Sequence, residues 1–173
     1  MRILFVDLNN FSRYPTMAVG YISAVLRESG HSVTVLSPLA VGVKGFPRVT
    51  RPGPLGLWTD FAKHISGTTS SRQVRKLRRS IVRSLRPTNS DAQARIVDQF
   101  RAARPETFDI VLLSTYSMFR PACTELCGIA QAAGVPVVAG GPLFSDQRVV
   151  NKWLEIDGLT GVFSGEPEEQ ISD

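Results

Sequence analysis

Five short apolar segments alternate with helical patterns along this chain, and they constrain its fold more than any other feature. Their sequences are RILFVD at residues 2–7, HSVTVL at 31–36, FDIVLLS at 108–114, VPVVA at 135–139 and LTGVFS at 159–164. Most are apolar at neighbouring rather than alternate positions, which is typical of strands buried on both faces. The sequence therefore predicts an α/β fold in which helices cover both sides of a five-stranded parallel sheet.

Helical patterns lie between these predicted strands. Apolar residues recur at helical spacing over 18–29 and 122–133, and Gly30 and Gly134 are placed to end those two helices. Ser12 or Thr16 is placed to cap the first helix. Further helices are predicted over 71–86, about 90–103 and 148–154. With 173 residues and no internal repeat, we expect one domain spanning 1–173.

The net charge of +5 is unevenly distributed. Residues 44–86 contain eleven basic residues and one acid, a net charge of +10, so the rest of the chain carries −5. This segment begins rich in Gly and Pro and continues rich in Ser and Thr. We interpret about 40–104 as a basic, helical insertion between the second and third strands.

The basic helix predicted at 71–86 has two possible roles. It could dock an acidic partner, or its arginines could form a solvated face of an amphipathic helix. No aromatic residues are interleaved with the arginines, which disfavours nucleic-acid binding.

Several protein classes are excluded or disfavoured. No apolar run reaches about 18 residues, so no transmembrane helix is predicted. Asp7 interrupts the first apolar run and no small-residue cleavage site follows, which disfavours a signal peptide. The two cysteines then indicate free thiols, and we expect a cytoplasmic protein.

Ligands of doubly wound sheets bind at the carboxyl ends of the strands, near the switch in strand order. The loop after the first strand lacks G-x-G-x-x-G and the P-loop motif, which argues against dinucleotide and P-loop NTPase sites. This loop can either hydrogen-bond a polar ligand or simply cap the next helix. Its candidate residues are Asn9, Asn10, Ser12, Arg13 and Tyr14.

Small residues follow the third and fourth predicted strands. Ser114, Thr115, Tyr116 and Ser117 could offer hydroxyl groups to a ligand, or form only a turn and a helix cap. Gly140-Gly141-Pro142 removes side chains where a flat ligand could lie on the backbone, although a tight turn could need the same pair.

The ordered set of motifs resembles a known family. The motifs are MRILFVDLN, GYISAVLRESGHSVTVL, FDIVLLSTYS, GVPVVAGGPLFS and VFSGEPEE. Together they look like the N-terminal cobalamin-binding domain of the B12-dependent radical SAM enzymes, over nearly the whole chain except the insertion. The resemblance implies a flavodoxin-like, Rossmann-type doubly wound sheet that holds cobalamin at the carboxyl ends of its strands.

The resemblance also implies roles for individual residues. Ser114 and Thr115 match the serine site beside the nucleotide tail of cobalamin, and Gly140, Gly141 and Pro142 match the glycine turn under that tail. Gly165, Glu166 and Glu168 match the closing G-E-x-E motif of the family. The implied function is cobalamin binding within a methyltransferase, in which the cofactor carries the chemistry.

Two departures from related modules affect the expected cofactors. Classical B12 modules supply a histidine to cobalt from a D-x-H-x-x-G loop, whereas Asp7-Leu8-Asn9-Asn10 contains none. Binding without a histidine ligand is common in the radical SAM branch, so we expect no lower histidine. We interpret His31 as structural and His64 as a solvated residue of the insertion.

The second departure concerns the iron–sulfur cluster. Radical SAM enzymes hold a [4Fe–4S] cluster with C-x-x-x-C-x-x-C, but here Cys123 and Cys127 are followed by Ala130 at the third position. We therefore expect the two cysteines to be packing or surface residues, with no metal ligands and no catalytic residue in the chain. The cluster and SAM would belong to a catalytic domain absent from this sequence, in a longer chain or a partner.

Two alternative functions remain open. One is the N-terminal half of a nucleotide-sugar glycosyltransferase, which also begins with an apolar strand, a helix and a G-H-x-V-x-V strand but leaves GGP and GEPE unexplained. The other is a non-enzymatic receiver-like binding module, against which Ser114 stands where the phosphoacceptor aspartate would be.

Overall fold

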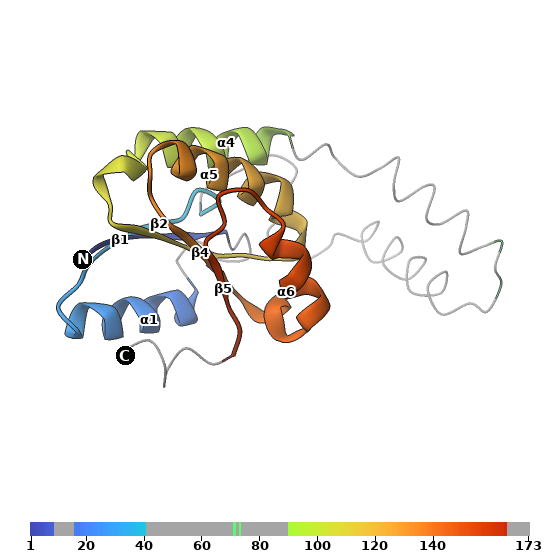
Figure 1. Ribbon diagram of the computed structural model, residues 1–173, viewed down its shortest axis with the longest axis horizontal. Helices are drawn as coiled ribbons and strands as arrows, with labels where there is room; N and C mark the ends of the chain where they lie inside the picture. The colour runs from blue at the N-terminus through green and yellow to red at the C-terminus, as the bar shows by residue number, and fades with distance from the viewer. Residues whose placement is uncertain (9–15, 41–70, 72, 74–89, 166–173) are drawn as a thin grey trace, which may run out of the picture. The chain divides into compact units, whose positions relative to one another are not determined.

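The computed structural model describes residues 1–8, 16–40, 71, 73 and 90–165, and places five parallel strands in one sheet (Figure 1). The strand order is β2-β1-β3-β4-β5, the flavodoxin-like order of doubly wound folds. This confirms the predicted fold class. The strands are β1 (Arg2–Asp7), β2 (Ser32–Leu36), β3 (Ile110–Ser114), β4 (Val137–Gly140) and β5 (Gly161–Phe163).

The helices cover the two faces of the sheet unequally. In Figure 1, α1 lies on one side of the sheet, and α4 and α5 lie on the other. The helices are α1 (Met17–Glu28), α4 (Ser90–Ala102), α5 (Arg120–Ala132) and α6 (Gln147–Leu154), with short 3₁₀ segments η1 (Pro105–Thr107), η2 (Ser117–Phe119) and η3 (Pro142–Ser145).

The face under α4 and α5 forms the larger core. Phe100 of α4 and Leu126 of α5 are fully buried in the same cluster as alternate residues of β1, β3 and β4. Those strand residues are at most 1% exposed: Leu4, Val6, Val111, Leu113, Val137 and Ala139. The apolar stripes of the two helices therefore exclude water from this face of β1, β3 and β4.

The α1 face is covered only in part. Ile3, Phe5 and Val33 are buried against Val19 and Leu26 of α1. Farther along the sheet, the side chains on this face are only partly buried, among the residues that the structure describes: Ile110, Leu112, Val138 and Phe163. We call these four residues the apolar strip.

The termini of α1 follow from local side-chain chemistry. Thr16 is the N-cap, and its hydroxyl oxygen accepts the Val19 N–H at 3.4 Å. Of the two predicted caps, the structure uses Thr16. The helix ends at Glu28 and is followed by Gly30, whose φ of 84° lies in the left-handed region that glycine adopts without strain.

Four strands are shorter than their apolar segments. The third segment loses Phe108 and Asp109, because the Phe108 N–H bonds Pro105 of η1 and the Asp109 carboxylate accepts the Arg2 N–H. The fourth begins after Pro136, which has no N–H for the sheet. The apolar pattern therefore locates each strand but overestimates the length of every strand except β1.

Contacts divide the chain into two compact units, Met1–Phe46 with Ser90–Asp173, and Pro47–Asn89. The first unit contains the sheet. It also contains α4, although the sequence analysis placed this helix in the insertion of about 40–104. The helix belongs with the sheet because its apolar residues Ala92, Ile96, Val97 and Phe100 are buried in the core. The helix predicted at 71–86 lies outside the described residues, apart from isolated positions.

Within the described ranges, no helix combines the length and the apolar composition needed to cross a bilayer.

Two adjacent leucines of β3 test the unequal coverage of the sheet. Leu113 is 1% exposed under α4 and α5, whereas Leu112 is only partly buried beside α1. We expect Leu113→Ala to lower the free energy of unfolding by about 2–5 kcal/mol, and Leu112→Ala to cost less than half as much. Urea denaturation followed by circular dichroism measures both, and equal losses would contradict the partial exposure of the α1 face.

Candidate functional site

The strand register aligns four residues at the carboxyl edge of the sheet. Asp7 of β1 pairs with Ser114 of β3, Ser114 pairs with Gly140 of β4, and Gly140 pairs with Phe163 of β5. Directly paired residues in a sheet share a face, and Asp7 is two residues beyond Phe5, which packs against α1. We call Asp7, Ser114, Gly140 and Phe163 the edge row; it lies on the α1 face.

The edge row crosses the switch point of the sheet. The chain passes from β1 to β2 on one side and from β3 to β4 on the other, so the order reverses between β1 and β3. Asp7 and Ser114 flank this point, and the Leu8 N–H extends the β1–β3 pairing by donating to the Ser114 carbonyl at 3.0 Å. Ligands of doubly wound sheets bind at this position.

Gly140 leaves room for a small group beside Phe163 in the edge row. A Cβ at this position would meet only the Cβ of Phe163, at 3.8 Å, which is an ordinary van der Waals contact. The glycine therefore provides a low surface between Ser114 and Phe163, against which a flat group could lie.

Gly141 has a different role from its neighbour. Its φ is 143°, and a Cβ there would lie 2.6 Å from the Thr115 carbonyl oxygen. The Thr115 N–H also donates to the Gly140 carbonyl at 3.1 Å, so the turns after β3 and β4 are in close contact. Gly141 is thus required by a tight backbone turn, one of the two interpretations that the sequence left open.

Thr115 points to the other face of the sheet. Its side chain is fully buried, and its hydroxyl oxygen lies 3.2 Å from the Cys123 sulfur of α5. The Thr115 hydroxyl therefore does not join Ser114 on the α1 face. Its backbone, rather than its hydroxyl, is what borders the edge row.

The remaining described candidates surround the edge row. Tyr116 is partly buried and packs against the larger core, whereas Ser117 and Pro142 begin η2 and η3 and are exposed. Gly165 is exposed, with a φ of 115°. The other candidates lie outside the described residues: Asn9, Asn10, Ser12, Arg13, Tyr14, Glu166 and Glu168.

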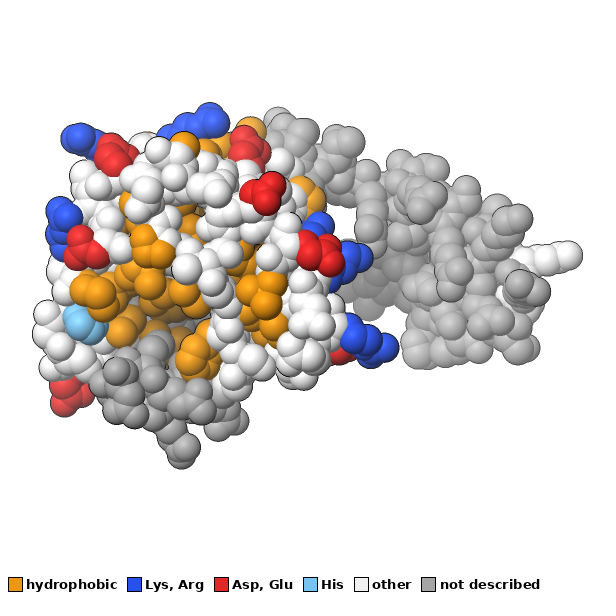
Figure 2. Space-filling view, viewed as in Figure 1, with side chains coloured by type: hydrophobic (Ala, Val, Ile, Leu, Met, Phe, Trp, Pro, Cys, Tyr) orange, Lys and Arg blue, Asp and Glu red, His pale blue; other side chains and the backbone are white. Residues whose placement is uncertain are grey.

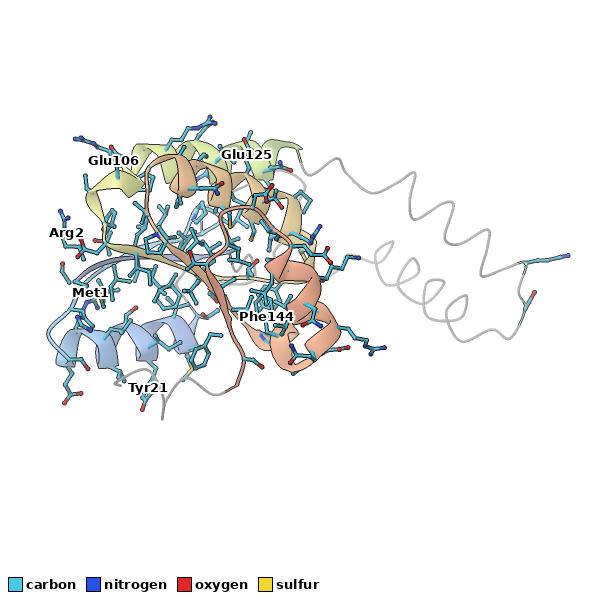
Figure 3. The ribbon with its side chains drawn as sticks, in the orientation of Figure 1. Met1, Arg2, Tyr21, Glu106, Glu125 and Phe144 are labelled. Carbon is cyan, nitrogen blue, oxygen red and sulfur yellow. The ribbon has the colours of Figure 1, made fainter. Side chains whose placement is uncertain are left out.

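Two contacts at this edge were missed by the sequence patterns. The Ser164 hydroxyl donates to the Phe144 carbonyl at 2.7 Å and ties η3 to the end of β5. Phe144 is fully buried and packs edge-on against Trp153 of α6, with ring centroids 5.2 Å apart. Figure 3 shows Phe144 at the opposite end of the sheet from Met1 and Arg2.

The sequence patterns also missed Asp7. It is 1% exposed, and its Oδ2 accepts the Thr16 N–H at 2.9 Å. The sequence does contain a signal for this residue, because an acidic residue ends a strand that is otherwise mostly apolar. A polar group buried there requires compensating hydrogen bonds.

The histidines contribute no ligand to the described part of this edge. His31 precedes β2 at the amino edge of the sheet, where its Nδ1 lies 3.4 Å from the N-terminal nitrogen. His64 lies outside the described residues. Within the described ranges, no group of three His, Cys, Asp or Glu side chains could hold a metal ion.

The two cysteines are buried packing residues of α5, one of the two roles predicted for them. Burial raises the pKa of the Cys123 thiol to about 12 and that of Cys127 to about 11, from an ordinary value of 9.0. Both thiols are therefore protonated at neutral pH, whereas cluster ligation requires thiolates.

No protein-family model, curated protein or solved structure matches this chain.

The neighbouring glycines give a matched stability test. We expect Gly141→Ala to lower the free energy of unfolding by at least about 2 kcal/mol, because the new Cβ combines an unfavourable φ with a backbone overlap. Gly140→Ala should change it by less than about 1 kcal/mol, because its Cβ makes an ordinary contact. Urea unfolding curves measure the free energy of unfolding of both variants. A Gly141→Ala variant as stable as the wild type would refute the tight turn.

The buried thiols predict a loss of stability at alkaline pH. The folded state keeps thiol protons that the unfolded chain loses above about pH 9, so this stabilisation is present below pH 9 and declines toward pH 11–12. We expect a Cys123→Ala/Cys127→Ala double variant to show a shallower decline in urea midpoint between pH 8 and pH 10.5. Parallel declines in the double variant and the wild type would contradict burial of the neutral thiols.

Proposed function

We propose that this chain is a cobalamin-binding domain of the type found in B12-dependent radical SAM enzymes, and that it binds the cofactor at the edge row. The observation that carries the proposal is the alignment of Ser114 and Gly140 on neighbouring strands, directly beside the switch point. These two residues belong to LLSTYS and AGGP, which are parts of two of the five motifs on which the family resemblance rests.

The apolar strip supports the fit of a flat, largely apolar group. Ile110, Leu112, Val138 and Phe163 are partly exposed beside α1, although parallel sheets normally have both faces covered. In the view of Figure 2, hydrophobic side chains gather between the α1 layer and the α4–α5 layer, with charged side chains around them. A benzimidazole base lying over Gly140 would bury part of this surface.

Individual residues then have distinct parts in binding. The Ser114 hydroxyl would hydrogen-bond the nucleotide tail, Gly140 would give the base access to the sheet, and Phe163 would border it. Gly141 contributes to binding indirectly, because it allows the turn after β4 to approach the turn after β3. The corrin supplies the methyl-transfer chemistry when it is bound, and the protein supplies its position.

No histidine among the described residues lies at the carboxyl edge, where it could act as a ligand to the cobalt. His31 lies at the amino edge, the opposite end of the strands from the edge row. Burial of the benzimidazole base in the protein would remove it from the cobalt. The proposal therefore predicts a base-off cofactor without a histidine ligand.

Binding to hydroxocobalamin tests the proposal directly. The purified chain is mixed with the cofactor, desalted, and its visible spectrum recorded. We expect retained cobalamin with a base-off spectrum. A protein fraction that elutes colourless would overturn the proposed function.

A matched pair of glycine variants tests the location of the site. Gly140→Leu places a side chain over the edge row without a Cβ overlap, so we expect it to weaken cobalamin binding by about tenfold or more, about 1.4 kcal/mol. Gly128→Leu makes the same change at an exposed position of α5, where a Cβ has no neighbour within 4 Å. Unchanged binding by the folded Gly140→Leu variant would refute this location.

A further inference from the structure

Asp7 combines burial, charge and a position in the edge row. It is 1% exposed and is the one charged residue among the buried residues of the described chain. A buried carboxylate is costly unless hydrogen bonds compensate it, and an apolar residue would end β1 without that cost. A role at this position is therefore expected beyond filling space.

The backbone N–H of Thr16 gives the carboxylate such a role. Asp7 Oδ2 accepts the backbone N–H of Thr16 at 2.9 Å, across nine positions of sequence. Thr16 is the N-cap of α1, so this bond attaches the N-terminus of the helix to the carboxyl end of β1.

The Asp7 carboxyl group lies at the N-terminus of α1, whose first turn contains no acidic residue of its own. The same carboxylate is adjacent to Ser114 in the register, so the position of α1 is set directly beside the proposed site.

We propose that Asp7 is a positioning residue that holds the N-terminus of α1 against the edge row, and that cobalamin affinity depends on this attachment. The affinity clause rests on the proposed function; the attachment itself does not.

The test compares Asp7→Ala, which removes the acceptor, with Asp7→Asn, which keeps an oxygen that can accept the Thr16 N–H. For Asp7→Ala, loss of a buried hydrogen bond predicts about tenfold weaker hydroxocobalamin binding under conditions where circular dichroism shows a folded chain. For Asp7→Asn we expect binding within about threefold of the wild type, because the acceptor is retained.

Asp109 provides the matched control. Its Oδ2 also accepts a backbone N–H, that of Arg2 at 2.7 Å, but at the amino edge of the same sheet. Asp109→Ala should therefore leave cobalamin affinity unchanged, whatever it does to the thermal midpoint. A folded Asp7→Ala variant with wild-type affinity, or an Asp7→Asn variant as weak as Asp7→Ala, would overturn the positioning role.

Amide hydrogen exchange by NMR tests the attachment without the cofactor. In Asp7→Ala, the Thr16 N–H should exchange at least about tenfold faster than in the wild type, with α5 amides unchanged. Unchanged Thr16 exchange would refute the attachment. A wild-type chain that binds no cobalamin would instead overturn the proposed function and the affinity clause, while exchange still decides the attachment.

If Asp7→Ala does not fold, the same bond can be removed from the donor side. Thr16 has a φ of −60°, which proline adopts, so Thr16→Pro removes the N–H without demanding a new φ. Thr16→Ala removes the capping hydroxyl but keeps the N–H, and so controls for the cap. Weaker binding by Thr16→Pro than by Thr16→Ala supports the role of Asp7, and equal affinities overturn it.

Discussion

The parallel register of the central strands is the constraint on which the rest of the candidate site depends. Because β1, β3 and β4 end level with one another, Asp7, Ser114 and Gly140 form one line at the carboxyl edge. A shift of one residue in any pairing would move the corresponding side chain to the other face. The alternation that buries Leu113 and Val137 under α4 and α5 therefore also places Ser114 and Gly140 on the α1 face.

Unequal coverage gives this line its chemical character. On the α4–α5 face, dense packing extends to Thr115 and Cys123, and both side chains are removed from solvent. On the α1 face, β1 is covered but the apolar strip is only partly buried. A hydroxyl and a glycine at the edge of such a surface suit a ligand with one polar end and one flat apolar group, which is the chemistry of a nucleotide tail that ends in benzimidazole.

The sequence was sufficient to predict the sheet, because strands buried on both faces leave continuous apolar runs, and Gly30 and Gly134 mark helix ends through their backbone freedom. It could not separate Gly140 from Gly141, since only the approach of the Thr115 carbonyl distinguishes an open position from a required turn. The sequence also could not separate Thr115 from Ser114. The two side chains point to opposite faces of the sheet, and this is evident only when the end of β3 is known. Asp7 was passed over because its partner, Thr16, is brought to it by tertiary structure.

The central claim is that cobalamin binds on the carboxyl edge of the sheet, across β1, β3 and β4. Backbone amide chemical shifts measured by NMR during a hydroxocobalamin titration test it most directly. The account predicts that the largest changes occur at Ser114, Gly140 and Phe163, with small changes at His31 and Asp109 on the amino edge. Changes centred on the amino edge, or a titration without changes in the edge row, would contradict it.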